Sequence, residues 1–344
     1  MVNKKKIVLG ISCGDVNGIG VEIIIKTFLN NQRLLQLCTP VLYIPESVVT
    51  FYKKLYPKFK SFNYNTVKCA KEAVVSEFNI INLYSQCIDL EPGISTKESA
   101  QIAIRSLDLA TQDLKKKSIN TLLTLPVNKK NISTVKKGFV GHTEYLSQKM
   151  NNDDNLMLLC DKSLRIATLT NHLPISKVAP SITKQIIQEK ISILIDALKI
   201  DFGISAPKIA VLGLNPHTGD EGLIGHEDMS IINPAVYEFY ERGHLIYGPY
   251  SADGFFGSGN YKNFDAILAM YHDQALIPFK LMSFGRGVNY TAGLSMIRVS
   301  PDHGVGYDIA GKGTAQINSV QSAILLSIEL YSNRKLYFDC NQKK

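Results

Sequence analysis

Short runs of apolar residues alternate with longer segments of helical periodicity along most of the chain. Apolar runs bounded by Gly, Pro or Asn are typical of buried strands. They predict strands at 6–11, 39–45, 78–84, 163–170, 208–215 and 265–271, with a further short strand in SINTLLTLPVNKKNI. Apolar residues at helical spacing predict helices at 21–31, 95–117, 176–201 and 317–333. This alternation favours an α/β fold with parallel sheets covered on both faces.

The glycine-rich stretches connect the predicted strands and helices. Gly14, Gly18 and Gly20 follow the first strand, but their spacing is neither GxGxxG nor that of a Walker loop. The sequence therefore assigns no nucleotide to this segment, which is either a tight turn before a helix or part of a ligand cleft. The segment 284–315 is also rich in glycine, and we expect it to be irregular.

The length of 344 residues exceeds what one hydrophobic core usually supports, so we expect two domains. Apolar residues make up 45% of the chain and charged residues 20%, as in ordinary globular proteins. No apolar run approaches the roughly 18 residues of a membrane span, and the first apolar stretch is too short for a secretion signal. Six scattered cysteines without a CxxC pair are typical of reduced thiols. We expect a cytoplasmic protein.

The net charge of +8 comes largely from short lysine clusters, such as Lys115 to Lys117. A solvated surface explains these clusters as well as an anionic partner does. No recognisable nucleic-acid module accompanies them, so we expect no DNA or RNA partner.

Three of the seven histidines share one setting, just past a predicted strand. They are His172 in RIATLTNHLP, His217 in IAVLGLNPHTG and His272 in AILAMYHDQ. Open α/β sheets bind ligands at the carboxyl ends of their strands, where side chains distant in sequence can converge. Three imidazoles suit an ion such as Zn²⁺, Co²⁺ or Ni²⁺ and leave coordination positions open for substrate. The alternative is that each histidine is a hydrogen-bonded residue of its own surface loop.

A candidate anion site lies in GHTEYLSQK, where His142 and Thr143 stand at a predicted helix start with Glu144 in its first turn. Helix amino-termini bind phosphate or carboxylate groups through free N–H groups. Simple capping of the helix explains the same residues equally well.

Lys280, Asn289 and Arg298 recur at intervals of nine after the third histidine. Lysine and arginine are the usual carriers of phosphate recognition, although plain surface exposure is the alternative for this set. Asp253 and His303 are further polar residues in predicted loops, and either could line a cleft.

These residues lie in stretches that resemble one known family over nearly the whole chain, 4-hydroxythreonine-4-phosphate dehydrogenase of pyridoxal 5′-phosphate biosynthesis. The matching stretches are GDVNGIGVEI, LPVNKKNI, GHTEYL, TNHLP, GLNPHTGDEGLIGHED, LAMYHDQALIPFK, VNYTAGLSMIRVSPDHG and DIAGKGTA. Their number and order make the resemblance specific. The chain departs from it at Val16 and Val21, where prolines are usual, and at Pro301, and none of these is a proposed ligand.

The resemblance implies an isopropylmalate-dehydrogenase-like α/β fold, with two α/β/α domains flanking a central cleft. We place the first domain at 1–130 plus 304–344, and the second, which carries most of the metal and substrate site, at 131–303. The resemblance also implies a homodimer whose active site lies near the subunit interface and borrows groups from the partner.

The family's metal ligands match His172, His217 and His272, which would hold one zinc, cobalt or magnesium ion. Its substrate contacts match a second set of residues, His142, Thr143, Lys280, Asn289 and Arg298. Asp253 and Asp273 are weaker candidates for orienting a ligand or handling a proton. The residues that would bind the nicotinamide are not identified.

The family oxidises the 3-hydroxyl of 4-phosphooxy-L-threonine with NAD or NADP, and the β-keto acid then loses CO₂ to give 3-amino-2-oxopropyl phosphate. A divalent ion suits this task because it can acidify the hydroxyl and stabilise the enolate. Close relatives of the family act on phosphorylated threonate or erythronate, or on aromatic cis-dihydrodiol carboxylates. The retained anion-binding residues favour a phosphorylated substrate. A metal-dependent hydrolase and a non-catalytic binding protein are the alternatives from other classes.

Overall fold

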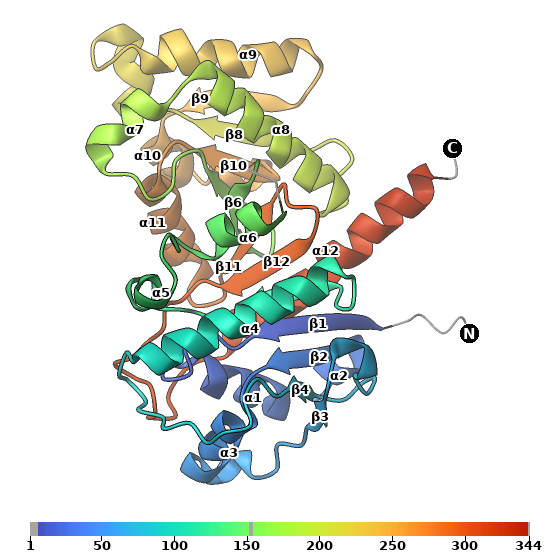
Figure 1. Ribbon diagram of the computed structural model, residues 1–344. Helices are drawn as coiled ribbons and strands as arrows, with labels where there is room; N and C mark the ends of the chain where they lie inside the picture. The colour runs from blue at the N-terminus through green and yellow to red at the C-terminus, as the bar shows by residue number, and fades with distance from the viewer. Residues whose placement is uncertain (1–5, 151–153, 343–344) are drawn as a thin grey trace. The chain divides into compact units, whose positions relative to one another are not determined.

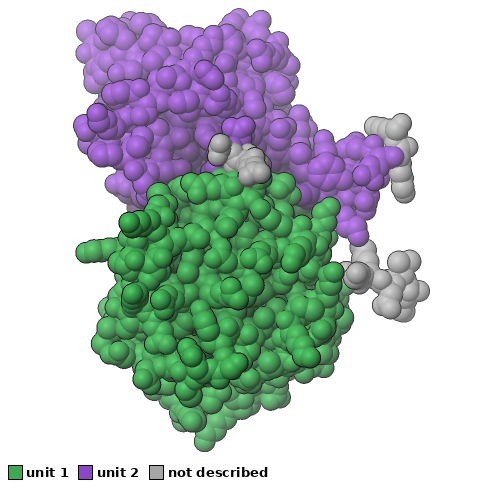
Figure 2. Space-filling model, viewed as in Figure 1, with its two compact units in different colours: residues 1–153, 295–331 green, residues 154–294, 332–344 purple. Residues whose placement is uncertain are grey.

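The computed structural model describes residues 6–150 and 154–342 and divides the chain into two compact units (Figures 1 and 2). Unit 1 comprises residues 1–153 and 295–331, and unit 2 comprises residues 154–294 and 332–344. The predicted domain boundaries stay a prediction, and this division into compact units differs from them at 131–153, 295–303 and 332–344. The reason for the second range is strand pairing, because Ile297–Pro301 pairs in parallel with a strand of unit 1.

Within the described residues, unit 1 contains six strands, and neighbouring strands of the unit run parallel. Their order is β3-β4-β2-β1-β5-β12. The strands are β1 (Ile7–Ser12), β2 (Cys38–Tyr43), β3 (Asn65–Val67), β4 (Asn79–Ile81), β5 (Thr121–Thr124) and β12 (Ile297–Pro301). The helices are α1 (Gly20–Asn30), α2 (Leu34–Leu37), α3 (Glu46–Leu55), α4 (Lys97–Lys115), α5 (Lys129–Val135) and α6 (His142–Met150), with the short turns η1 (Pro57–Phe59) and η2 (Ala70–Glu72).

Helix α4 shows how the sequence pattern sets the layers of unit 1. The Thr96 hydroxyl caps its start by accepting a hydrogen bond from the Ser99 N–H at 3.1 Å. Apolar residues at helical spacing, such as Ile102, Leu107 and Leu114, form its buried face. That face packs on β1, β2 and β5 (Figure 1). All residues of β2 and β5, and the last four of β1, are buried on both sides of the sheet.

Unit 2 is built on six further strands, in the order β11-β6-β7-β10-β8-β9. They are β6 (Leu156–Asp161), β7 (Leu164–Thr168), β8 (Ile209–Leu212), β9 (Ile246–Tyr250), β10 (Ala266–Ala269) and β11 (Val288–Ala292). The helical segments are α7 (Ile175–Ser181), α8 (Lys184–Ile200), α9 (Asn233–Glu241), α10 (Ala252–Gly257), α11 (His272–Ser283), η3 (Pro216–Gly222), η4 (Asp228–Ile232) and η5 (Asn260–Asn263). The last helix, α12 (Asn318–Asn341), belongs to unit 1 as far as residue 331 and to unit 2 beyond it.

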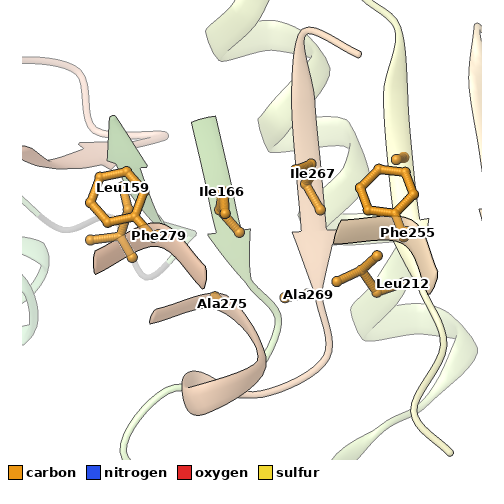
Figure 3. Close-up of a cluster of buried hydrophobic side chains, with 9 residues drawn as sticks. Leu159, Ile166, Leu212, Phe255, Ile267, Ala269, Ala275 and Phe279 are labelled. Atoms are coloured by element: carbon orange, nitrogen blue, oxygen red, sulfur yellow. The ribbon is translucent and has the colours of Figure 1, made fainter. Parts of the chain in front are cut away.

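The core of unit 2 fixes the helix that carries His272. Ala275 and Phe279 of α11 are fully buried against side chains of β6, β7, β8 and β10, including Leu159, Ile166 and Ile267 (Figure 3). Burying a phenylalanine side chain stabilises a fold by roughly 1.5–3 kcal/mol. The packing therefore anchors α11 while its first turn stays at the end of β10.

The α/β fold is confirmed, and a strand or helix occurs in each segment where the pattern predicted one. Three expectations were wrong in detail. The helix at 176–201 is divided into α7 and α8, because Thr183 caps a new helix start by accepting from the Ile186 N–H at 3.2 Å. The segment 284–315 is not irregular throughout, since it contains β11 and β12. The sheet of unit 2 is not wholly parallel, because β6 runs antiparallel to both β7 and β11.

No helix within residues 6–150 and 154–342 is long and apolar enough to cross a membrane. A cytoplasmic location stays a prediction.

Candidate active site

The three histidines follow three neighbouring strands of unit 2. His172 comes after β7, His217 lies in η3 after β8, and His272 is the first residue of α11 after β10. Strands β7, β10 and β8 are adjacent and parallel, so their carboxyl ends share one edge of the sheet. This is the edge where ligands of open α/β sheets bind.

His172 and His272 lie side by side in the structure. Their ring centroids are 5.8 Å apart, with the ring planes at 43°. The Nδ1 atom of His272 is 2.7 Å from the Asp273 carboxylate, which leaves Nε2 as the ring nitrogen able to bind a metal. A carboxylate behind a ligating imidazole is the usual way in which proteins orient such a ring. These donors fit a divalent ion.

His217 lies outside this pair. Among the described residues, no group of three or more His, Cys, Asp or Glu side chains is placed to hold a metal ion. The exposed Asp253 carboxyl has a lowered pKa, mainly because it accepts hydrogen bonds from the Ser251 hydroxyl at 2.5 Å and from the Gly254 N–H. The charge of His217 lowers this pKa by a smaller amount. The chain by itself thus provides two adjacent imidazoles and a third elsewhere at the same edge.

The loop that carries His217 has an unusual backbone. Residues 217–221 all have positive φ values, between 45° and 84°, and only Gly219 among them is a glycine. Left-handed conformations cost roughly 1–2 kcal/mol for each non-glycine residue. The buried Asp228 carboxylate supports the loop by accepting from the N–H groups of Leu214 at 2.7 Å and Asn215 at 3.0 Å.

A second cluster forms in unit 1 around Arg298 on β12. Its side chain is buried, with the residue only 3% exposed, and it donates to the Thr124 hydroxyl on neighbouring β5 from Nε at 3.1 Å and Nη2 at 2.6 Å. A longer contact of 3.5 Å joins Nη1 to the Thr143 hydroxyl. Burial lowers the pKa of the Arg298 guanidinium to about 10, and the Glu144 carboxylate opposes this shift. The group therefore remains a buried cation at neutral pH.

His142 stands beside this cation at the start of α6. Burial lowers the pKa of its imidazole well below the ordinary value, and the charges of Arg298 and Lys129 lower it further. Its Nε2 atom is enclosed and has no hydrogen-bond partner among the described residues. Buried polar atoms are nearly always paired, so this one points to a ligand. A neutral imidazole, a guanidinium and a helix amino-terminus together favour an anion.

The remaining predicted residues lie at separate positions. Lys280 is exposed on α11, and Asn289 on β11 has a buried Oδ1 atom without a partner among the described residues. His303 follows β12, and its enclosed Nε2 atom is likewise unpaired there. Burial lowers the pKa of this imidazole as well.

Sequence reasoning missed Thr124, Asp228 and Gln274. Thr124 is a polar residue at the end of a buried strand, shortly before Pro126. A polar residue at the end of an apolar run is the signal that identified the three histidines. Asp228 bonds to Leu214 and Asn215 in the preceding loop, and Gln274 bonds to Met270 and to Gly213, which is distant in sequence, and no local pattern marks these bonds.

Residues 36–327 match the model of the family named pyridoxal phosphate biosynthetic protein PdxA. The chain belongs to this family. It is 44% identical to the 4-hydroxythreonine-4-phosphate dehydrogenase of Bacteroides thetaiotaomicron, over 97% of this chain and 91% of that protein. It is 41% identical to the enzyme of the same name from Sulfurihydrogenibium sp., over 95% and 99% of the two chains.

Solved structures agree with the assignment to the PdxA family. The 4-hydroxythreonine-4-phosphate dehydrogenase from Klebsiella pneumoniae matches with a TM-score of 0.82 and 30% identity, over 96% of this chain and 99% of that one. A terephthalate 1,2-cis-dihydrodiol dehydrogenase from Burkholderia xenovorans, 23% identical with a TM-score of 0.62, shares the fold over 94% and 98% of the two chains. The resemblance found in the sequence motifs is confirmed.

Proposed function

We propose that this member of the PdxA family oxidises 4-hydroxythreonine 4-phosphate at its 3-hydroxyl with NAD or NADP. The product would be a β-keto acid, which loses CO₂ to give 3-amino-2-oxopropyl phosphate. The observation that carries this proposal is the match to enzymes of that activity over nearly the whole chain. The buried cation Arg298 beside an unpaired imidazole supports a phosphorylated substrate.

In this proposal, Arg298, Thr143 and His142 bind the substrate. The hydrogen bonds to Thr124 hold the guanidinium in place before substrate arrives, so less side-chain entropy is lost on binding. A neutral His142 can donate from Nε2 to a phosphate oxygen without placing a second positive charge beside Arg298. Lys280 would add a positive charge, and the buried Asn289 oxygen would accept from a substrate hydroxyl or amino group.

His172, His217 and His272 would hold one divalent ion, with zinc, cobalt and magnesium as the candidates. When bound, the ion supplies Lewis acidity to the substrate hydroxyl, and the nicotinamide coenzyme accepts the hydride. The chain's own contribution is to orient the imidazoles, as Asp273 does for His272. The Asp253 carboxylate is our candidate for handling a proton, although its lowered pKa makes it a weaker base than an ordinary aspartate.

The separate position of His217 supports a homodimer in which the partner subunit completes the site. One chain brings two imidazoles together and leaves the third apart. A closed dimer would allow a histidine of one copy to join ligands of the other.

The activity is tested by mixing the protein with 4-hydroxythreonine 4-phosphate, NAD or NADP, and zinc, cobalt or magnesium salts. We expect the absorbance of reduced nicotinamide to rise. Release of inorganic phosphate without reduction of the coenzyme would instead support the hydrolase alternative. Failure to bind any of the three ions would support a non-catalytic binding protein.

Two substitutions test the assigned roles. His272→Ala should lower kcat by orders of magnitude while the protein stays folded, and His244→Ala, whose ring packs on Phe239 of α9, is the matched control. Arg298→Ala should mainly raise KM for the phosphorylated substrate, with the exposed Arg242→Ala as control. Near-normal turnover of the first variant would refute the metal assignment, and an unchanged KM of the second would refute the phosphate role.

A further inference from the structure

The strand ends that carry the three histidines are joined by hydrogen bonds beyond the last paired residues of the sheet. Between β7 and β10 the backbone itself continues the connection. The Leu169 N–H donates to the Ala269 carbonyl at 2.8 Å, and the Thr170 N–H donates to the Met270 carbonyl at 3.2 Å. The Thr170 hydroxyl donates to the same carbonyl at 2.8 Å. These two strand ends therefore stay together up to the residues next to His172 and His272.

Between β10 and β8 a side chain takes the place of the backbone. The last paired residues of this ladder are Leu268 and Val211. Two positions further in the same register stand Met270 and Gly213, and these two residues are bridged by Gln274. Its Oε1 accepts from the Met270 N–H at 2.7 Å, and its Nε2 donates to the Gly213 carbonyl at 2.7 Å.

A side-chain amide between two strands separates their ends by more than direct pairing would, because neighbouring paired strands lie only about 4.8 Å apart. The pattern of bonds accounts for the positions of the histidines. His172 and His272 leave strand ends that remain paired, and their rings lie 5.8 Å apart. His217 follows β8, whose end is linked to that of β10 through Gln274, and among the described residues it forms no metal-holding group with that pair.

We propose that Gln274 is a positioning residue that sets the separation of the His217 and His272 loops, and so the placement of these metal ligands. This inference rests on the proposed function, because it concerns the same metal site. Asp228 supports the same arrangement from the other side of Gly213, through its bonds to the N–H groups of Leu214 and Asn215. Gln274 itself contacts neither substrate nor metal in this proposal.

We expect the fold to persist without this amide, which makes the proposal testable. Strands β8 and β10 are already paired through three residue pairs, and α11 is anchored by Ala275 and Phe279. Two substitutions remove the bridge in different ways. Gln274→Glu keeps the acceptor for Met270 but places a carboxylate against the Gly213 carbonyl. Gln274→Met has a similar volume and forms neither bond.

The experiment titrates the full-length protein with Co²⁺ and records both the affinity and the visible absorption of the bound ion. Removal of groups that orient metal ligands typically lowers metal affinity 10- to 100-fold, and we expect a loss in that range for both variants. We also expect a changed Co²⁺ spectrum, because the geometry of the ligands changes, together with a lower kcat. Circular dichroism should show folded proteins. Gln112→Glu, on the exposed face of α4 in unit 1, is the matched control.

The outcomes separate this inference from the proposed function. If both variants bind Co²⁺ with the affinity and spectrum of the unmodified protein, the positioning role of Gln274 is refuted and the proposed function stands. If the unmodified protein binds no Co²⁺ and reduces no coenzyme, the proposed function itself fails. If a variant loses thermal stability while its folded fraction keeps normal affinity and spectrum, Gln274 serves the fold alone and the proposal is also refuted.

Discussion

At the scale of single residues, burial prepares the candidate phosphate site for an anion. Arg298 keeps its charge although it is almost fully buried, and the adjacent imidazole of His142 is held neutral by burial and by that charge. Burying a charged group is costly, and a bound phosphate would offset part of that cost. Occupied, the site would be more stable than empty.

The lowered pKa of His142 predicts how stability depends on pH. An unfolded histidine has a pKa of about 6.5, so the unfolded chain takes up the proton first as the pH falls. The stabilisation is therefore fully present above about pH 6.5 and is lost below it. His303, whose pKa is also lowered, acts in the same direction. We expect the free energy of unfolding in urea to fall between about pH 7 and pH 5.

Substitution separates the contribution of His142 from that of other groups. His142→Gln removes the titrating ring, so its stability should fall less steeply over this pH range than that of the unmodified protein. His244→Gln controls for the loss of any histidine. An unchanged slope in His142→Gln would show that this imidazole is not held neutral in the folded protein.

At the scale of elements, a buried ion pair ties helix α1 to the segment after β12. Lys26 lies 2.5 Å from Glu22 on the next turn and donates to the carbonyls of Gly313 at 2.8 Å and Ala315 at 3.0 Å. The Glu22 carboxylate also accepts from the Tyr56 hydroxyl at 3.0 Å. Since both charged side chains are buried, each depends on the other for compensation.

Removing one member of this pair should destabilise unit 1 strongly. Lys26→Met leaves the Glu22 carboxylate buried without its cation, and we expect a loss of about 3 kcal/mol in the free energy of unfolding. Denaturant unfolding measures the loss. The exposed Lys54→Met on α3 should change stability by less than about 0.5 kcal/mol. A loss below 1 kcal/mol in Lys26→Met would mean that the pair is not important for stability.

The elements that the sequence did not predict share a physical cause. Strand β9 contains Gly248 and Pro249, which read locally as a turn, yet its pairing with β8 makes it a strand. Strand β11 lies between glycine-rich segments and is defined by its antiparallel partner β6. Long periodic helices such as α4 and α12 were predictable because their signal is local. Strand pairing is not local.

The same distinction applies to the candidate site. The position of each histidine after a strand could be predicted from apolar runs and the residues that end them. The closeness of His172 and His272 could not, because it depends on β7 and β10 being neighbours. The contact of Arg298 with Thr124 likewise depends on the pairing of β12 with β5.

At the scale of the whole molecule, exposed apolar side chains follow the same strands as the histidines. Ile175 comes after β7 and is 73% exposed, and Leu223 comes after β8 and is 85% exposed. On α11, Ile277 and Leu281 are exposed and four residues apart, which places them on one face of the helix, and Phe284, just past the helix end, is exposed as well. Exposed apolar faces of this kind mark interaction sites. A second copy of the chain is the occupant that our proposed active site requires.

This surface predicts that a substitution which prevents dimer formation also lowers the activity. Leu281→Glu places a charge in the centre of the exposed face of α11, where it would be desolvated in a dimer, so we expect sedimentation or light scattering to report monomers. Coenzyme reduction should fall with the dimer, because in the proposed function one chain alone does not complete the metal site, while the folded structure is retained. Val75→Glu, at a 62% exposed position of unit 1, is the matched control and should remain an active dimer. A Leu281→Glu protein that stays dimeric would place the interface elsewhere, and one that is monomeric but fully active would show that a single chain assembles the site.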